Sequence, residues 1–197
     1  MAGLTPEQIK ECEMRRIREN EKLKGIIEKA KADGVHKSII RTLEVYDSCK
    51  TDAERMPIEL YDGATEEEIA AFEKEWNIRL PEEFREFLKF SNGARLYEAV
   101  LDICGVQKDF KNYCSLYPEN HPETRAELIE GGIPIPDNHF IIATNSGVSL
   151  VCADLDTGEI VEWDLDFCEC EITGANFFDY LEEVVIDYME WKERVNE

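Results

Sequence analysis

The sequence predicts an α+β fold, in which an antiparallel or mixed sheet of about four to six strands is covered by helices on one side. Two short amphipathic helices over residues 63–93 precede a block of alternating, turn-punctuated segments over 139–164. A strongly amphipathic helix over 176–190 follows that block. Neighbouring strands grouped together, with helices before and after them, favour α+β over a parallel α/β arrangement.

Residues 1–55 are predicted to form a helical N-terminal extension, and residues 56–197 the main domain. Charges of alternating sign and a weak apolar stripe predict one helix over 5–33, and a clearer stripe predicts a second helix over 36–49. The sequence leaves open whether this arm packs on the domain or projects from it. Exposed helices of this kind also offer a surface for self-association.

The helical pair at 63–93 carries explicit start and stop signals. Thr65 is followed three residues later by Glu68, which is the pattern of a capping box. Pro81 suits the first turn of the next helix, and Asn92-Gly93 suits a left-handed stop. Further on, Asn176 is placed to cap the last helix.

Three strands are predicted after residue 138, with the sequences HFIIATN, VSLVCAD and EIVEWD. Asn145-Ser146-Gly147 separates the first two, and Asp156-Thr157-Gly158 separates the last two. Both tripeptides favour tight turns between antiparallel strands. These three strands therefore form a predicted antiparallel meander.

The chain is strongly acidic, with a formal net charge of −22 over 197 residues. Residues 1–34 hold eight basic and seven acidic residues, whereas 126–191 hold sixteen acidic residues and no Lys or Arg. Such a field repels nucleic acid and anionic membranes and attracts basic proteins. We therefore expect a basic protein partner, no nucleic-acid partner and no membrane association.

The cysteines and the N-terminal residues bear on the compartment. Seven cysteines at irregular spacing, with no apolar signal-like segment at the start, predict reduced thiols and a cytoplasmic location. Cys104 and Cys152 lie in apolar runs and are predicted to be small core residues. No apolar run has the length of a membrane span.

Enzyme chemistry finds little support in the residue pattern. His36, His121 and His139 have no catalytic or metal-ligand spacing. A calcium loop starting at Asp154 would need Glu at its twelfth position, which is Leu165. Cys168-Glu-Cys170 is spaced too closely for a zinc motif and has no second pair, so its two cysteines are predicted to share one face of a strand. We therefore expect no catalytic residue, no metal and no cofactor; a metal-dependent enzyme is the least favoured hypothesis.

The most acidic stretch, DLDTGEIVEWDLDFCECE, begins at Asp154. Strand alternation predicts that Val161, Trp163 and Leu165 meet the helices, while the acidic residues between them face solvent on the open side of the sheet. A charge run is most often only a solvated face, but this one is unopposed by basic residues along the chain. The candidate partner-binding residues are its eight acids: Asp154, Asp156, Glu159, Glu162, Asp164, Asp166, Glu169 and Glu171.

The order of these segments resembles the SUKH superfamily, which includes a fungal regulator of cell-wall synthesis and many bacterial immunity proteins encoded beside toxins. The resemblance covers residues 63–190 and is most specific over Leu80–Gly93 and Asp154–Ile160. The chain has Asn92-Gly93-Ala94 where the family often has Asn-Gly-Gly, and its loop over 107–133 is its own.

The resemblance implies a binding protein without catalytic residues. It favours an immunity protein that neutralises a cognate toxin. We expect that toxin to be basic, because a nuclease-type toxin needs a basic surface to hold nucleic acid. The alternative is a regulatory or scaffolding module of the same fold, with the helices of residues 1–55 as its docking element.

Overall fold

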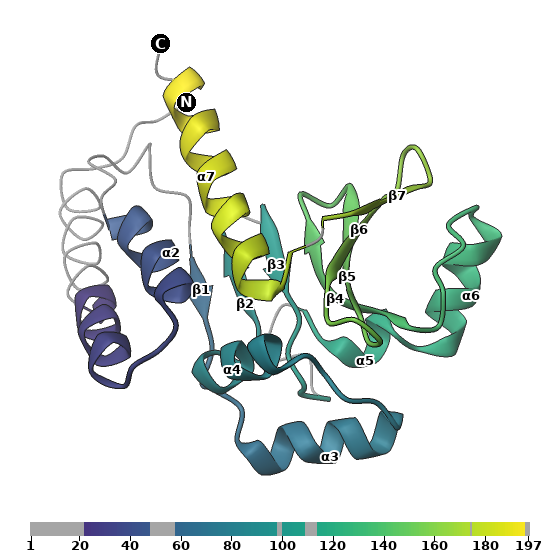
Figure 1. The fold of residues 1–197 in the computed structure, drawn as a ribbon, viewed down its shortest axis with the longest axis horizontal. Helices are drawn as coiled ribbons and strands as arrows, with labels where there is room; N and C mark the ends of the chain where they lie inside the picture. The colour runs from purple at the N-terminus through teal and green to yellow at the C-terminus, as the bar shows by residue number, and fades with distance from the viewer. Residues whose placement is uncertain (1–21, 48–57, 98–99, 109–113, 174, 196–197) are drawn as a thin grey trace, which may run out of the picture.

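The structure of the chain is a computed structural model that describes residues 22–47, 58–97, 100–108, 114–173 and 175–195 (Figure 1). Residues 22–32 are helical, in agreement with the helix predicted over 5–33. The predictions for 5–21 and for 48–49 lie outside the described residues. The division of the chain at residue 55 stays a prediction.

Among the described residues, seven strands form one antiparallel sheet in which each strand pairs with the next along the chain. The strands are β1 (Glu59–Leu60), β2 (Ala94–Leu96), β3 (Leu101–Ile103), β4 (His139–Asn145), β5 (Ser149–Asp154), β6 (Ile160–Asp164) and β7 (Glu169–Ile172). The predicted α+β class and the meander of β4, β5 and β6 are confirmed. The strand count exceeds the predicted four to six by one, and β1, with two residues, is too short for alternation to be recognised.

The helices that follow residues 22–32 are α2 (Lys37–Asp47), α3 (Glu66–Trp76), α4 (Glu82–Phe90), α5 (Leu116–Glu119), α6 (Pro122–Glu130) and α7 (Phe177–Val195). The main core lies between α7, α4 and one face of the sheet, and it also takes Ile39 from α2 and Phe72 from α3. α2 is therefore packed on the main body of the protein. No helix within the described part of the chain is long and apolar enough to cross a membrane.

The capping box and the tight turn that the sequence predicts are both present in the structure. Thr65 and Glu68 make both hydrogen bonds of a capping box at the start of α3. Ser146 and Gly147 have φ of 51° and 68°, which gives the tight β4–β5 turn its left-handed backbone. Gly93 is also left-handed, but α4 ends earlier, at Phe90, with Ser91 as its extended cap.

α7 is held at its first turn by aromatic packing. The ring of Phe177 lies 5.1 Å from that of Phe84 and 5.4 Å from that of Phe87, both on α4. Just before the helix, the carbonyl of Ala175 accepts a 2.8 Å hydrogen bond from the amide of Ile160, the first residue of β6. α7 thus starts beside the beginning of β6, and Figure 1 shows it rising separately from the β6–β7 hairpin.

A second, smaller core covers the opposite face of the sheet. It is made by residues from β4, β5 and β6 and by two isoleucines that follow α6, namely Ile133, Ile135, Ile141, Leu150, Cys152, Val161 and Trp163. Leu128 of α6 packs against it. Helical cover is therefore not confined to one side, because α6 lies on the far side of β4–β7 from α7 (Figure 1).

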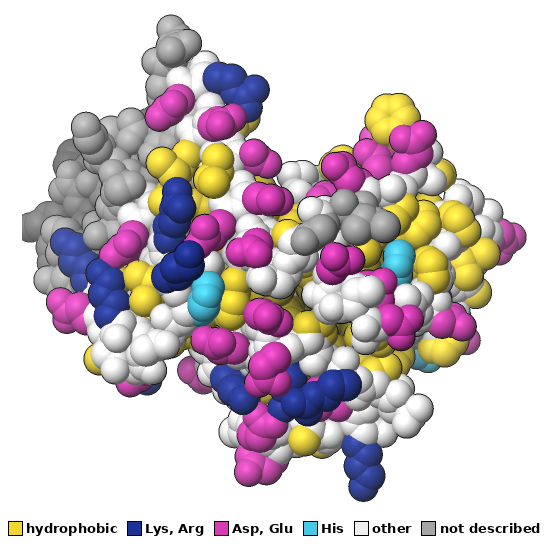
Figure 2. Space-filling view, viewed as in Figure 1, with side chains coloured by type: hydrophobic (Ala, Val, Ile, Leu, Met, Phe, Trp, Pro, Cys, Tyr) yellow, Lys and Arg dark blue, Asp and Glu magenta, His cyan; other side chains and the backbone are white. Residues whose placement is uncertain are grey.

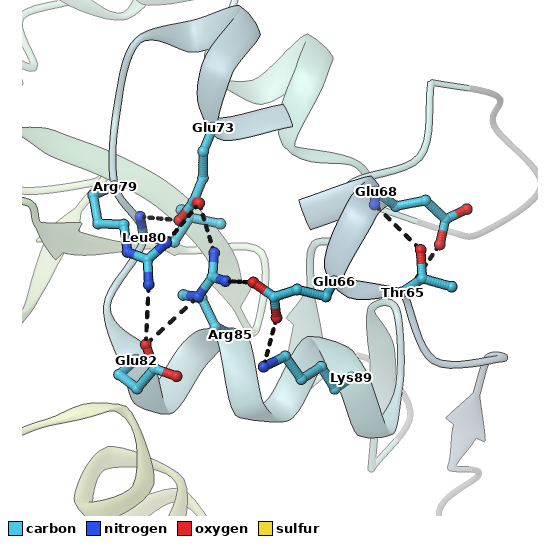
Figure 3. Close-up of polar contacts among 9 residues, drawn as sticks. All are labelled: Thr65, Glu66, Glu68, Glu73, Arg79, Leu80, Glu82, Arg85 and Lys89. Atoms are coloured by element: carbon cyan, nitrogen blue, oxygen red, sulfur yellow. Dashed lines mark hydrogen bonds and ion pairs between the residues drawn. The ribbon is translucent and has the colours of Figure 1, made fainter. Parts of the chain in front are cut away.

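A buried ion pair ties α3 to α4 (Figure 3). Arg85 on α4 is 2% exposed, and its Nη1 lies 2.6 Å from Oε2 of Glu73 on α3. The other oxygen of Glu73 accepts a 2.9 Å hydrogen bond from the amide of Leu80, in the link between the helices. Arg85 also contacts Glu66, whose pKa is lowered mainly by the hydrogen bond from Lys89.

The cysteines differ from expectation at one pair. Cys104 and Cys114, ten residues apart, form a disulfide, so the prediction of reduced thiols is wrong for these two. Cys152 is free and buried, as predicted, while Cys168 and Cys170 are free and exposed. Cys168 lies in the turn before β7 with φ of 55°, so the two do not share a strand.

Removing the buried guanidinium should destabilise the fold strongly. We expect Arg85→Met to lower the free energy of unfolding by about 3–5 kcal/mol, because Glu73 would lose its buried cation and keep only the mostly exposed Arg79. Arg79→Met is the matched control, since Arg79 contacts the same Glu73 carboxylate from a mostly exposed position and should cost about 0–1 kcal/mol. Urea unfolding measures both; equal costs would contradict the structural role given to Arg85.

Candidate partner-binding surface

The eight acidic residues predicted as a binding site fall into three groups. Asp154, Asp156 and Glu159 lie around the β5–β6 turn, and Asp166 lies in the β6–β7 turn. These turns are at opposite ends of β6, a strand of five residues that spans about 15 Å. The remaining four lie on β6 and β7 between the turns, and we call them the acidic ladder: Glu162, Asp164, Glu169 and Glu171.

The carboxylate of Asp154 shapes the β5–β6 turn. Its Oδ1 accepts hydrogen bonds from the amides of Asp156 and Thr157, at 2.8 and 3.3 Å, and from the side chain of Asn138 at 3.1 Å. Partial burial acts to raise the pKa of Asp154, but these hydrogen bonds outweigh it and the pKa is lowered. Asp154 therefore has a structural role that explains its presence without a partner.

His139 connects this turn to the smaller core. Its Nδ1 accepts a 3.1 Å hydrogen bond from Nε1 of Trp163, which is the arrangement of a neutral imidazole. Its Nε2 faces Asp154 at 3.9 Å. Burial lowers the pKa of His139, opposed by the charge of Asp154 and assisted by that of Arg125.

The acidic ladder consists of like charges set directly opposite each other. Glu162 pairs with Glu171, and Asp164 pairs with Glu169, across the two antiparallel strands. Cross-strand partners of the same sign repel each other and destabilise a sheet. The ladder therefore costs stability, and its carboxylates need an explanation other than holding β6 and β7 together.

Alternation along β6 is confirmed, but the predicted assignment of its two faces is wrong. Val161, Trp163 and Leu165 pack in the smaller core and not against α7. Glu162 and Asp164 consequently point to the side of the sheet on which α7 lies. The prediction of the two faces failed because Ile133 and Ile135, which cover the other face, lie in a proline-bearing loop with no strand or helix pattern.

Two members of the acidic ladder are fixed in place. Oδ1 of Asp164 accepts 2.8 Å hydrogen bonds from the amides of Asp166 and Phe167, which shape the β6–β7 turn. Glu162 is held by neighbouring elements. Its two oxygens accept hydrogen bonds of 3.1 Å, one from the side chain of Asn145 on β4 and one from the hydroxyl of Tyr180 on α7. Burial raises the pKa of Tyr180, and the nearby charges of Glu162 and Glu183 act in the same direction. The helix thus adds its own acidic wall opposite the ladder.

Basic residues do not balance this surface. In the described ranges, no Lys, Arg or His lies within ion-pair distance of a ladder carboxylate. Ion pairs elsewhere include those that join α3 to α4 and α2 to α7. Figure 2 shows acidic side chains along α7 and around the β6–β7 hairpin, on either side of a hollow.

Exposed apolar side chains accompany the acids, and the prediction missed them. Phe167 is 76% exposed in the β6–β7 turn, beside Asp166. Trp191 on α7 and Val148 in the β4–β5 turn are exposed as well. An aromatic residue within a short, highly charged turn was the available signal for Phe167.

In the described part of the chain, no group of three or more His, Cys, Asp or Glu is arranged to hold a metal ion.

Comparison with known protein families identifies the family of this chain. The model of the SMI1 / KNR4 family (SUKH-1) matches residues 63–183. The chain belongs to this family. No curated protein matches it. The SUKH-1 match begins just before α3 and ends within α7, so it contains the whole acidic ladder but neither α2 nor the last turns of α7. The family includes toxin immunity proteins.

Neutralising one rung of the ladder should stabilise this SUKH-1 protein. We expect Glu171→Gln to raise the free energy of unfolding by about 0.2–1 kcal/mol, because it removes repulsion across the strands. Glu127→Gln on α6 is the control, since it changes the net charge equally but lies outside the ladder. Urea unfolding at low and high salt is the measurement; the gain should shrink with salt. A loss of stability would contradict the repulsive pairing.

The state of His139 gives a pH dependence with a defined sign. Its folded-state pKa lies below the unfolded value of about 6.5, so the folded state binds fewer protons. Its contribution is complete above about pH 6.5 and is lost as pH falls through the folded pKa. Asp154 also has a lowered pKa, but its contribution is lost only below about pH 3.9.

Replacing His139 should therefore flatten the pH profile. We expect His139→Gln, which keeps an acceptor for Trp163, to lose less stability than the parent between about pH 7.5 and pH 5. His121→Gln, at an exposed position ahead of α6, serves as the control. Unfolding curves at both pH values give the comparison; parallel profiles for the parent and His139→Gln would count against a buried neutral imidazole.

Proposed function

We propose that this SUKH-1 protein is an immunity protein that neutralises a cognate basic toxin, of nuclease type, by stoichiometric non-covalent binding. The acidic ladder carries the proposal, because two like-charge pairs on adjacent strands oppose folding and gain a favourable role only with a cationic partner. Binding functions commonly retain residues that cost stability.

Electrostatics suit such a partner. A nuclease must present basic residues to hold a phosphate backbone. A surface of dense carboxylates on a chain with net charge −22 would steer that toxin into contact and occupy its nucleic-acid site. The proposal requires neither a cofactor nor catalysis by this chain. It has the protein meet the toxin in the cytoplasm.

Three members of the ladder, the half-buried Asp164 and the exposed Glu169 and Glu171, should be required for neutralisation. We expect the triple variant Asp164→Asn, Glu169→Gln and Glu171→Gln to bind the toxin at least about tenfold more weakly, because it loses charge at the centre of the contact. Glu162 is left intact since it also supports Tyr180. The measurement is binding to, and growth protection against, a basic nuclease toxin domain, taken from the neighbouring gene where that gene encodes one.

A matched control keeps the change in net charge the same. The triple variant Glu123→Gln, Glu127→Gln and Glu130→Gln alters α6 alone and should retain binding and protection. Full protection by the ladder variant would show that the ladder is not the binding site. Loss of protection in both variants would show that only the net charge of the protein matters.

A regulatory or scaffolding module is the second candidate. The favouring observation is that Leu23 and Ile27, outside the matched family region, form a separate apolar cluster with Leu43 of α2. Deleting residues 1–35 keeps α2 and its contacts with α7. The truncated protein should still neutralise toxin if it is an immunity protein, and should lose its partner if the N-terminal helices are the docking element.

A further inference from the structure

We propose that a groove beside α7, next to the acidic ladder, receives an apolar anchor side chain from a basic amphipathic segment of the partner protein. This inference rests on the proposed function and adds to it the place where the partner is anchored. The acidic ladder and the groove would then recognise two different features of the same segment, its cations and its apolar side chain.

The groove has a volume of about 530 Å³, within the range of cavities that hold a small ligand or a large side chain. Val184, Tyr188 and Trp191 line it from α7, and Val100 lines it from the sheet side. Asn145, at the end of β4, completes the wall opposite the helix. Its lining therefore combines apolar side chains from the helix and from Val100 with polar and charged ones.

Trp191 is placed as a rigid aromatic contact. Its ring lies 6.1 Å from that of Tyr188, and Tyr188 stacks on Tyr97 at 4.1 Å. Tyr97 and Tyr188 are buried, whereas Trp191 is 41% exposed at the end of this row. An exposed Trp supported from beneath by buried rings loses little conformational entropy on binding, and Trp is enriched among the residues that dominate interface energies.

The groove and the acidic ladder are continuous. Asn145 lines the groove and also donates to Glu162, the first rung of the ladder, at 3.1 Å. Asp187 lines the groove from the helix side. An occupant of the groove would therefore have carboxylates on both flanks, which favours Lys or Arg beside its apolar side chain.

The same charges argue against other occupants. A second copy of this chain would bring the same acidic surface into contact with itself, which is unfavourable for a chain of net charge −22. Arg194 is the basic residue that lines the groove, at its outer end, where Nε donates to the carbonyl of Glu190 on its own helix. Its charge should repel a cationic segment. Removing that charge should therefore strengthen binding, whereas removing the Trp191 ring should weaken it.

The experiment uses the full chain and a synthetic peptide with Lys and Leu at helical spacing as the probe. A second peptide in which Ser replaces every Leu keeps the charge and removes the anchor. We expect the Leu-containing peptide to bind more tightly in calorimetric titration. Trp191→Ala should weaken it about tenfold or more, and Arg194→Gln should tighten it about twofold to threefold.

Met189→Ala is the matched control, since Met189 is 38% exposed on α7 but does not line the groove; it should change binding by less than about twofold. Urea unfolding confirms that each variant is folded. Equal binding of the two peptides, or no effect of Trp191→Ala, would overturn the groove. Self-association that disappears in Trp191→Ala would also overturn it, by making a second copy the occupant.

The proposed function and the groove can be disproved by different results. If the ladder variant abolishes toxin binding while Trp191→Ala leaves both peptide and toxin binding unchanged, the protein acts through charge alone and the groove is wrong. If neither variant affects toxin binding, the acidic surface is not the binding site, and the groove loses the partner that it was inferred to hold.

Discussion

The seating of Phe177 against Phe84 and Phe87 fixes the path of α7, and much of the surface depends on that path. The helix must begin where the chain leaves the sheet beside Ile160, and it must pack on α4. It then covers the strands near β2 and β3 and leaves β6 and β7 uncovered on the same side. An aromatic contact in the core thus decides which carboxylates remain open to a partner.

The uncovered strands differ from the rest of the sheet in how they are stabilised. Their apolar residues, Val161 and Trp163, turn toward the smaller core behind the sheet. On the face toward α7, Ile160 packs in the main core, Glu162 is held by Asn145 and Tyr180, and Asp164 shapes the β6–β7 turn. Glu169 and Glu171 of β7 are exposed. A surface that does not maintain the fold can accept repulsive charge, since the cost is offset by burial on the opposite face.

Sequence-based prediction succeeded where the signal is local. The capping box of Thr65 and Glu68 and the turn at Ser146-Gly147 depend on residues a few positions apart, and both form as predicted. The direction of Glu162 depends instead on Ile133 and Ile135, which are distant in sequence and lie in an irregular loop. The groove was also beyond prediction, because the side chains that line it come from segments separated by about half of the chain.

The family match ends at residue 183, part-way along α7. Its first turns, with Phe177 and Tyr180, belong to the shared SUKH-1 framework and to the core. Asp187, Trp191 and Arg194 lie past that point, on turns whose outward side chains can be exchanged without unseating the helix. A lineage under pressure from changing partners could therefore retune recognition by substituting this last segment, while the framework that presents it stays intact.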